Sequence, residues 1–358
     1  MGVDLTVITP PHWGRQHLEI SDFDGYRVRV VPCLFSGYTH FHFYRERLGA
    51  LDADLVHLEE EPWSIVTQQV MRKCAKAKIP VVFFTWQNIW KRYPQPFAYF
   101  ERYAHAHAHG AIAGNKEAKL ILERRGFAKP VKVIPQLGVD PVIFQPRDAS
   151  TLRTELSLDH KFVVGYVGRV VESKGIADLV RAMTLLPQHA VLVIVGDGDF
   201  SPMVKDLAAR LGLVTRIRCL PWVKSLDVPQ YMSMFDVLVL PSRTTKRWKE
   251  QFGHVLIEAM ACDVPVLGSD SGEIPNVIGD GGLVFPEGDI DRLAAHLSEL
   301  CKNSDYRREL GRKGRARVLR HFTDDRIAEQ TLDFYLEVLG RFPNDSAQPA
   351  LTTASVSS

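Results

Sequence analysis

The 358-residue sequence has no apolar run of about 18 residues, so no helix is expected to span a membrane. It opens with MGVDLTVITPP, which lacks the basic start and apolar stretch of a secretory signal. Its five cysteines are scattered and form no CxxC pair, which favours free thiols in a reducing cytoplasm over disulfides or structural zinc. These absences predict a cytoplasmic protein, and peripheral contact with the inner face of the membrane stays open as an addition.

The sequence also lacks a large excess of positive or negative charge. The net charge of +2 is too small to indicate a nucleic-acid partner. Apolar residues make up 46% and charged residues 24% of the chain, which is typical of a soluble globular protein. Because domains usually hold about 100–200 residues, the length predicts two of them.

What the sequence does contain is a regular alternation. Short apolar, β-branched runs are separated by amphipathic segments such as 174–186, where apolar residues recur at three-to-four spacing. Continuous apolar strands between helices indicate buried parallel sheets, and two such series predict an α/β protein of two Rossmann-like, doubly wound domains. The predicted strands are 3–9, 26–32, 54–60, 80–86, 110–115, 131–135, 162–168, 190–196, 216–221, 236–241, 264–269 and 282–286, and the clearest other helices are 62–78, 94–108 and 115–125.

The predicted domain break lies in the polar stretch 141–160, and the Ser-, Thr- and Pro-rich end from Pro343 is expected to be disordered. The opening is unusual for a Rossmann-like domain, because residues 3–9 lead into Pro10-Pro11 and resemble a second strand more than a first. The expected organisation is an N-terminal domain over 1–143, a C-terminal domain over 144–322, a last helix over 323–342 and a tail over 343–358.

The first candidate site follows the run that ends at Gly168. Arg169 and Lys174 come after this predicted strand, and a helix is expected after Gly175. Ligands bind beyond the carboxyl ends of strands in open α/β sheets. There, Arg offers a planar fork, Lys a point charge and a helix start free N–H groups to phosphate oxygens. The pattern indicates a diphosphate site, with a solvated basic loop as the alternative.

The second candidate site is EQFGHVLIE, residues 250–258. Glu250 is expected in a loop after a strand and Gly253 at the start of the next helix, so Glu258 lies about one and a half turns into that helix. Two carboxylates so spaced can accept hydrogen bonds from two sugar rings of one ligand, and N–H groups near 252–254 can meet a phosphate between them. An acidic helix start without a ligand is the alternative.

A third motif, GDGDF, begins at Gly196 after another strand. It lacks the GxGxxG spacing and the acidic residue of a dinucleotide site, which argues against a dehydrogenase. A glycine turn that lets the backbone approach a ligand is all that it indicates.

Taken together, GRVVESKG, VLVIVGDGDF, MFDVLVLPS and EQFGHVLIEAMACDVPVLGSDSGEIPNVI resemble the glycogen-synthase-like, family 4 type of retaining glycosyltransferases with the GT-B fold. The likeness is strong over 160–322 and looser over 54–145. It implies two domains that face each other across a cleft, and a last helix, in 321–339, that crosses back to the N-terminal domain.

The resemblance also implies roles for residues. Arg169 and Lys174 would bind the donor diphosphate, Glu250 the transferred sugar and Glu258 the ribose. It implies a metal-independent, retaining hexosyltransferase (EC 2.4 class) of polysaccharide biosynthesis without a cofactor. The donor would be a UDP- or GDP-linked sugar and the acceptor a glycan or lipid-linked hydroxyl. The remaining donor-site candidates are Gly168, Gly196, Phe252, Gly253, Gly272 and Glu273.

The sequence departs from the family pattern in three places. The first strand, glycine-rich loop and first helix have no counterpart, so the N-terminal domain is expected to be truncated at its start. The histidine that many members carry after the strand at 80–86 is replaced by Trp86-Gln87-Asn88. VIPQLGVD is one residue longer than the common version of that turn. With Glu61, which ends a strand, Trp86, Gln87 and Asn88 are the acceptor or cleft candidates.

Two further features have two interpretations each. The alternating His105, His107 and His109 indicate a helix end far more than a metal site. The stretch 90–103 mixes aromatic and basic residues, which suits either packing within the domain or a membrane surface. The competing functions are a nucleotide-binding pseudoenzyme or truncated inactive form, and a GT-B sugar-nucleotide epimerase, against which the spacing of Glu250 and Glu258 argues.

Overall fold

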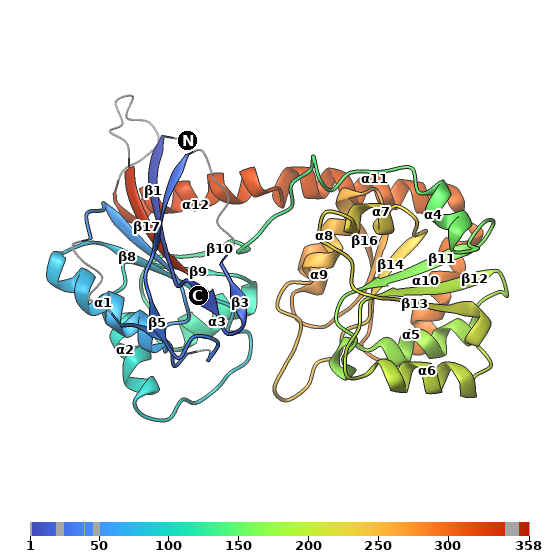
Figure 1. Ribbon diagram of the computed structural model, residues 1–358, viewed down its shortest axis with the longest axis horizontal. Coiled ribbons are helices and arrows are strands. Elements are labelled where there is room, and N and C mark those ends of the chain that lie inside the picture. The colour runs from blue at the N-terminus through green and yellow to red at the C-terminus, as the bar shows by residue number, and fades with distance from the viewer. Residues whose placement is uncertain (1, 19–24, 39, 46–50, 341–350, 358) are drawn as a thin grey trace. The chain divides into compact units, whose positions relative to one another are not determined.

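The computed structural model describes residues 2–18, 25–38, 40–45, 51–340 and 351–357. The chain divides into two compact units, which are described separately. The first holds residues up to Ile134 and from Glu329 onward, and the second holds Pro135–Ala328. Both are α/β units built on parallel sheets, as the alternation of apolar runs predicts (Figure 1).

The second unit contains a six-stranded parallel sheet in the order β13-β12-β11-β14-β15-β16. This is the doubly wound order, in which the chain runs outward from a central strand, returns, and runs outward the other way. Its strands are β11 Phe162–Val167, β12 Ala190–Val195, β13 Ile217–Leu220, β14 Val237–Leu240, β15 Val266–Ser269 and β16 Gly282–Phe285. Their side chains are mostly buried, as expected where helices cover both faces of a sheet.

The helices of the second unit follow the strands in sequence. Two of them have side-chain caps: Asp289 caps α10 by accepting a hydrogen bond from Arg292 N, and Asn303 caps α11 by accepting one from Tyr306 N. They are α4 Ser150–Glu155, α5 Ile176–Ala182, α6 Ser201–Arg210, α7 Val228–Met232, α8 His254–Ala261, α9 Ile274–Ile278, α10 Ile290–Lys302 and α11 Ser304–His321, with short 3₁₀ turns at Glu172–Lys174, Met183–Leu185 and Val214–Arg216.

The first unit contains a seven-stranded parallel sheet in the order β10-β9-β8-β7-β17-β1-β4. Its strands are β1 Val3–Thr9, β4 Tyr26–Val30, β7 Leu55–Glu59, β8 Val81–Thr85, β9 Gly110–Ala113, β10 Val131–Val133 and β17 Leu351–Ser357, and two small hairpins pair β2 His12–Trp13 with β3 Gln16–His17 and β5 Cys33–Leu34 with β6 Phe43–Tyr44. Its helices are α1 Ile65–Ala77, α2 Phe97–His107 and α3 Lys116–Arg124, joined by the last helix α12 Asp324–Val338.

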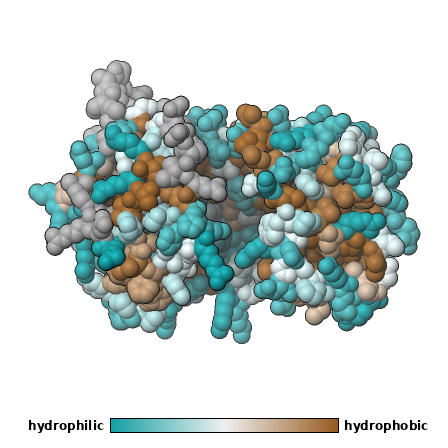
Figure 2. Space-filling view, viewed as in Figure 1, coloured by the Kyte–Doolittle hydropathy of each residue, from teal (hydrophilic) through white to brown (hydrophobic). Residues whose placement is uncertain are grey.

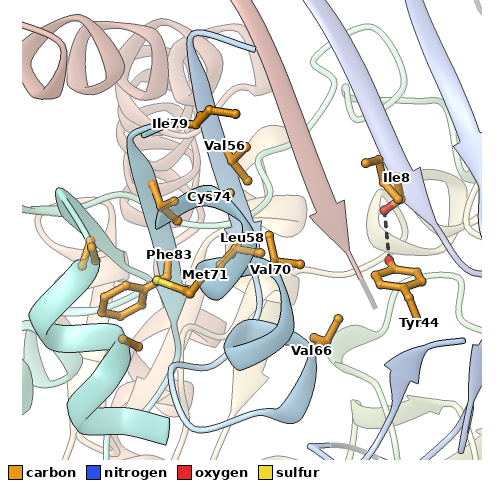
Figure 3. Close-up of a cluster of buried hydrophobic side chains, with 14 of the residues drawn as sticks. Ile8, Tyr44, Val56, Leu58, Val66, Val70, Met71, Cys74, Ile79 and Phe83 are labelled. Carbon is orange, nitrogen blue, oxygen red and sulfur yellow. Dashed lines mark hydrogen bonds between the residues drawn. The ribbon is translucent and has the colours of Figure 1, made fainter. Parts of the chain in front are cut away.

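A compact apolar core holds this unit together (Figure 3). Val56 and Leu58 of β7 and Phe83 of β8 lie against Val70 and Met71 of α1. The Tyr44 hydroxyl donates a hydrogen bond to the Ile8 carbonyl at 3.3 Å, which ties the segment before α1 to β1 (Figure 3). Burial of these side chains is the main stabilising term for the unit.

The C-terminal segment differs from the sequence-based expectation. Disorder is expected over 343–358, but Leu351–Ser357 form β17, which pairs in parallel with β1 on one side and β7 on the other. Residues 343–350 and 358 lie outside the described residues. The pairing satisfies backbone groups of β1 and β7, so neither strand presents an open edge at this point of the sheet.

The last helix contributes side chains to the first unit. Phe334 packs against Gly110 of β9, where a Cβ atom would come within 2.9 Å of its ring. The Tyr335 hydroxyl lies 2.6 Å from Nδ1 of His57 in β7. None of the helices in the described part of the chain is long and apolar enough to cross a membrane.

Candidate donor-binding site

The candidate site of the second unit lies at the carboxyl ends of β11, β12 and β14. Gly168 and Gly196 follow β11 and β12, and a Cβ atom on Gly196 would come within 2.1 Å of the Gly168 carbonyl oxygen. Both glycines have positive φ angles, 142° and 131°. The two loops can therefore lie backbone against backbone only because Gly196 lacks a side chain, and both glycines adopt φ values that other residues rarely take.

The next turn carries the predicted cations. After β11 the chain forms a 3₁₀ turn at Glu172–Lys174, and Gly175, with φ 68°, leads into α5. A Cβ on Gly175 would lie 1.8 Å from the Pro241 carbonyl oxygen, so this turn packs directly on the loop after β14. Arg169 is exposed at the end of β11, whereas Lys174 points toward the β14 loop. Of the two cations that the sequence singles out, Lys174 is the one that the structure pairs with Glu250.

Glu250 is the centre of the site. Its Oε2 atom accepts hydrogen bonds from Lys174 Nζ and Ser242 Oγ, both at 2.7 Å, and its side chain is buried. The Trp248 ring lies 5.0 Å from Lys174 Nζ, within cation–π range. The ion pair joins the ends of two neighbouring strands, β11 and β14, and holds the ammonium group in one place.

The loop after β15 closes on Glu250 from another direction. Gly272 has φ 56°, and a Cβ there would lie 1.9 Å from the Glu250 carbonyl oxygen. Glu273 donates its backbone N–H to that same oxygen at 3.2 Å and is itself buried. The structure therefore brings Gly272 and Glu273 to Glu250, as expected for parts of one site.

Helix α8 begins at the predicted place. Gly253, with φ 84°, precedes His254, and Phe252 is buried with its ring against Phe322 at 5.8 Å. Because the Phe252 side chain packs into the unit, only its backbone can serve a ligand. Glu258 lies one turn along the helix and meets His254 Nδ1 at 3.2 Å.

His254 was not singled out by sequence reasoning. Its Nε2 lies 2.8 Å from the Gly138 carbonyl oxygen, and Nδ1 faces Glu258, so the protonated ring can donate on both sides. Burial opposes protonation, but the hydrogen bond to Glu258, the charge of Glu258 and the bond to Gly138 together raise the pKa of His254. Ser242 and Trp248 were missed as well, because a serine and a tryptophan in a basic loop carry no spacing signal.

A pocket of about 170 Å³ lies beside Gly196, between the ends of β12 and β13 and helix α6. Its lining includes Gly196, Asp197, Ser201, Lys205, Cys219 and Pro221. Its lining offers the Gly196 backbone, the Asp197 carboxylate, the Lys205 ammonium and the Ser201 hydroxyl. These groups suit a planar polar ring.

The predicted acceptor candidates gather in the first unit, where β7 and β8 end. The Glu61 carboxylate accepts from Thr85 Oγ1 at 2.5 Å and from Trp86 N at 2.8 Å, and the Trp86 ring lies against Gly114, which leaves no room for a Cβ there. Gln87 and Asn88 are buried next in sequence. Burial raises the pKa of Glu61 to about 7, although the bonds from Thr85 and Trp86 oppose that rise.

Sequence reasoning missed two buried polar groups in the same unit. His42 Nε2 lies 3.0 Å from a Glu60 carboxylate oxygen, and both side chains are buried. Neither amide atom of Gln68 in α1, also buried, has a hydrogen-bond partner among the described residues. Buried amide groups without a hydrogen-bond partner are rare in native folds.

The three histidines at the end of α2 and just after it serve packing. The His105 ring lies between Phe83 and Phe127, and burial lowers its pKa to about 4. His109 Nδ1 accepts from Val81 N at 3.2 Å. His107 stacks on Tyr103 with ring centres 3.9 Å apart. The three rings contact different partners and do not converge on one point. This agrees with the interpretation as a helix end.

Residues 149–317 match the model of the family described as glycosyl transferases group 1. The parallel sheets of the two units and their structural neighbours show the fold: the chain has the GT-B fold. Over 79% of both chains it resembles Anabaena HepE, solved in complex with UDP, with a TM-score of 0.71 and 23% identity. Sucrose-phosphate synthase from Thermosynechococcus elongatus gives a TM-score of 0.72 at 22% identity, over 94% of this chain and 89% of that one.

Curated relatives agree at the level of sequence. N-acetyl-alpha-D-glucosaminyl L-malate synthase of Bacillus anthracis is 30% identical over 227 residues, which are 62% of this chain and 58% of that protein. Alpha-maltose-1-phosphate synthase of Mycolicibacterium smegmatis is 31% identical over 219 residues, 56% of this chain and 55% of that protein. The chain thus spans little more than half the length of these relatives.

Proposed function

We propose that this chain is a hexosyltransferase (EC 2.4 class) that moves a sugar from a nucleotide-sugar donor to a hydroxyl of a glycan or lipid-linked acceptor. The observation that carries the proposal is the Lys174–Glu250–Ser242 cluster at the carboxyl ends of β11 and β14. It lies within the segment that matches group 1 glycosyl transferases. A half-buried cation held at such an edge suits a diphosphate.

The donor is arranged along the edge of the second sheet. Lys174, Arg169 and the N-terminus of α8 meet the diphosphate, because two cations and a helix start favour anionic oxygens. Glu258 accepts from the ribose and Glu250 from the transferred sugar. The base occupies the pocket lined by Gly196, Asp197 and Lys205. HepE, of the same fold, binds UDP, so uridine donors are the first to test.

The chemistry follows from these charges. As the bond between sugar and diphosphate breaks, negative charge builds on the leaving oxygen, and in this proposal Lys174, Arg169 and the α8 N–H groups stabilise it. No metal ion is needed for that stabilisation. The acceptor hydroxyl attacks from the face that the nucleotide leaves, so the anomeric configuration is retained, and a diphosphate oxygen takes its proton.

The polar group around Glu61 is proposed to orient the acceptor hydroxyl. A carboxyl with a pKa near 7 can accept or donate a hydrogen bond at neutral pH. Gln87 and Asn88 add amide donors and acceptors next to it.

A donor-consumption assay tests the proposal. The chain is incubated with UDP-glucose, UDP-N-acetylglucosamine or GDP-mannose and a panel of glycan and polyprenyl-linked hydroxyl acceptors, with EDTA present. We expect acceptor-dependent nucleotide release that EDTA leaves unchanged, an α-linked product, and a loss of roughly a hundredfold or more in Lys174→Met, the size of one removed oxyanion contact. Failure of every donor, release that needs a divalent metal, or full activity of Lys174→Met would contradict it.

A further inference from the structure

His254, the first residue of α8, joins the donor site to the segment by which the chain enters the second unit. Its Nδ1 atom lies 3.2 Å from a carboxylate oxygen of Glu258, and its Nε2 atom lies 2.8 Å from the carbonyl oxygen of Gly138. The second unit begins at Pro135, so Gly138 lies just after the chain has crossed from the first unit. One ring thus contacts the carboxylate proposed to bind the ribose and a segment that connects the units.

Gly138 is itself fixed by the segment through which the chain returns to the first unit. Its N–H donates to Oδ1 of Asp324 at 3.1 Å, and the next residue, Val139, forms a parallel β-bridge with Thr323. Val139 N donates to the Phe322 carbonyl at 2.9 Å. A Cβ atom on Gly138 would lie 2.6 Å from Asp324 N, so the two segments touch backbone to backbone. The carbonyl that His254 contacts therefore has a fixed position within the second unit.

Both partners of the His254 ring accept hydrogen bonds and neither donates one. A backbone carbonyl offers only lone pairs, and so does an ionised carboxylate. A neutral imidazole carries one N–H group and can satisfy one of the two partners, whereas the protonated ring donates to both. Burial opposes protonation, but the charges that act on the ring, Glu258 on its own helix and Asp324 on the returning segment, are acidic and raise the pKa of His254. The protonated ring therefore holds the Glu258 carboxylate in a fixed position relative to Gly138.

Helix formation does not account for a cation at this place. The macrodipole disfavours a positive charge at a helix N-terminus, and Gly253, which precedes His254, provides no side-chain cap. Surface hydropathy does not mark the position either, because hydrophilic and hydrophobic side chains are mixed over the face of the second unit shown in Figure 2. What distinguishes His254 is its pair of hydrogen-bonding partners.

We propose that His254 is a positioning residue for the donor: it holds the Glu258 carboxylate in the orientation that accepts hydrogen bonds from the ribose hydroxyls. This inference rests on the proposed function, in which Glu258 binds the ribose. Without the ring, Glu258 is free to take other rotamers, and the donor has to fix one of them at a cost in conformational entropy. His254 acts through Glu258 and does not contact the reacting atoms.

A pH dependence of donor binding follows from this arrangement. As the pH rises through the pKa of His254, the ring loses one of its two N–H groups and can no longer hold both partners. Nucleotide affinity should therefore fall more steeply with rising pH in the wild type than in His254→Gln, whose amide does not titrate. The nucleotide phosphate titrates equally in both measurements, so the difference between the two proteins reports on His254 alone.

The test is a double-mutant cycle on the full chain, with dissociation constants for UDP, GDP and ADP measured by isothermal titration calorimetry. For the nucleotide that the wild type binds, His254→Ala should weaken binding about tenfold, the size of one hydrogen bond to a charged group. Glu258→Ala should weaken it at least as much. His254→Ala/Glu258→Ala should bind no worse than Glu258→Ala, because His254 then has no carboxylate to position. The matched control, His296→Ala, removes an imidazole from α10 of the same unit and should bind like the wild type.

Each variant is first checked for cooperative thermal unfolding, and His254→Gln replaces His254→Ala in the cycle if that variant fails to fold. Unchanged affinity in the His254 variant overturns the inference. So do losses that add up in the double variant, because His254 would then act independently of Glu258, and so do equal pH dependences in the wild type and His254→Gln. A wild type that binds none of the three nucleotides contradicts the proposed function, and this inference falls with it; the other outcomes overturn this inference alone.

Discussion

The ammonium group of Lys174 and the Oε2 atom of Glu250 lie 2.7 Å apart, although 76 residues separate them along the chain. One residue comes from the turn after β11 and the other from the loop after β14, which are neighbours in the sheet. A pair of this kind, with Glu250 buried and Lys174 half-buried, fixes the position of a cation before any ligand arrives. It also makes the stability of the second unit depend on both partners.

Replacing one partner of this ion pair should therefore destabilise the protein more than replacing both partners. In Lys174→Met, the buried Glu250 carboxylate loses its counter-charge, and we expect a loss of about 3 kcal/mol in the free energy of unfolding. Lys174→Met/Glu250→Gln should recover a large part of that loss, because no unpaired charge remains. Urea denaturation of the three proteins measures this. A double variant less stable than the single one would show that the pair does not behave as a buried ion pair.

His254 should make stability depend on pH near neutrality. Its pKa is raised above the ordinary 6.5, chiefly through Glu258 and the Gly138 carbonyl, against the effect of burial. A raised histidine pKa contributes stability that is fully present below 6.5 and is lost as the pH rises through the higher folded value. The wild type should thus exceed His254→Gln in melting temperature at about pH 6, with a gap that shrinks as the pH rises. A gap that grows with pH would contradict this.

Much of the second unit could be predicted from the sequence. Strands with side chains buried on both faces read as continuous apolar runs, and the glycines after β11 and β12 stand where the backbones touch. His254 could not be found this way. Its partner Gly138 lies 116 residues away, and only folding brings the carbonyl to the ring.

Glu61 should give a pH dependence of the same sign as that of His254. Burial raises its pKa from 4.5 to about 7, so the folded state holds a proton that the unfolded state releases. The stability of the wild type should fall as the pH rises through this range, because ionisation is resisted only in the folded state. Glu61→Gln, which cannot ionise, should lack this fall. The melting temperatures of the wild type and Glu61→Gln, measured between pH 4.5 and about 7, test this. Equal slopes of melting temperature against pH in both proteins would mean that the Glu61 pKa has its ordinary value.

The strand β17 should contribute to the stability and solubility of the first unit. It lies between β1 and β7 and pairs with both, so ending the chain before Leu351 leaves two strands with open edges inside one sheet. We expect the shortened chain to melt at a lower temperature and to aggregate faster than the full chain. Unchanged melting and unchanged solubility would show that β17 adds nothing to the sheet.

Composition explains why β17 was not predicted. Leu351–Ser357 read LTTASVS, which has little of the Val, Ile and Leu content expected of a strand inside a parallel sheet. The pairing comes from backbone groups of β1 and β7, and backbone groups are the same in every sequence.

The central claim is that the second unit binds a nucleotide sugar through Lys174, Glu250 and Glu258. Thermal unfolding of the full chain with UDP, GDP and ADP, and of Glu258→Ala with the same ligands, tests it most directly. A nucleotide at a hundred times its dissociation constant should stabilise the wild type by about 2.7 kcal/mol. We predict that UDP raises the melting temperature and that Glu258→Ala weakens this response. No shift with any nucleotide, or an equal shift in Glu258→Ala, would contradict the account.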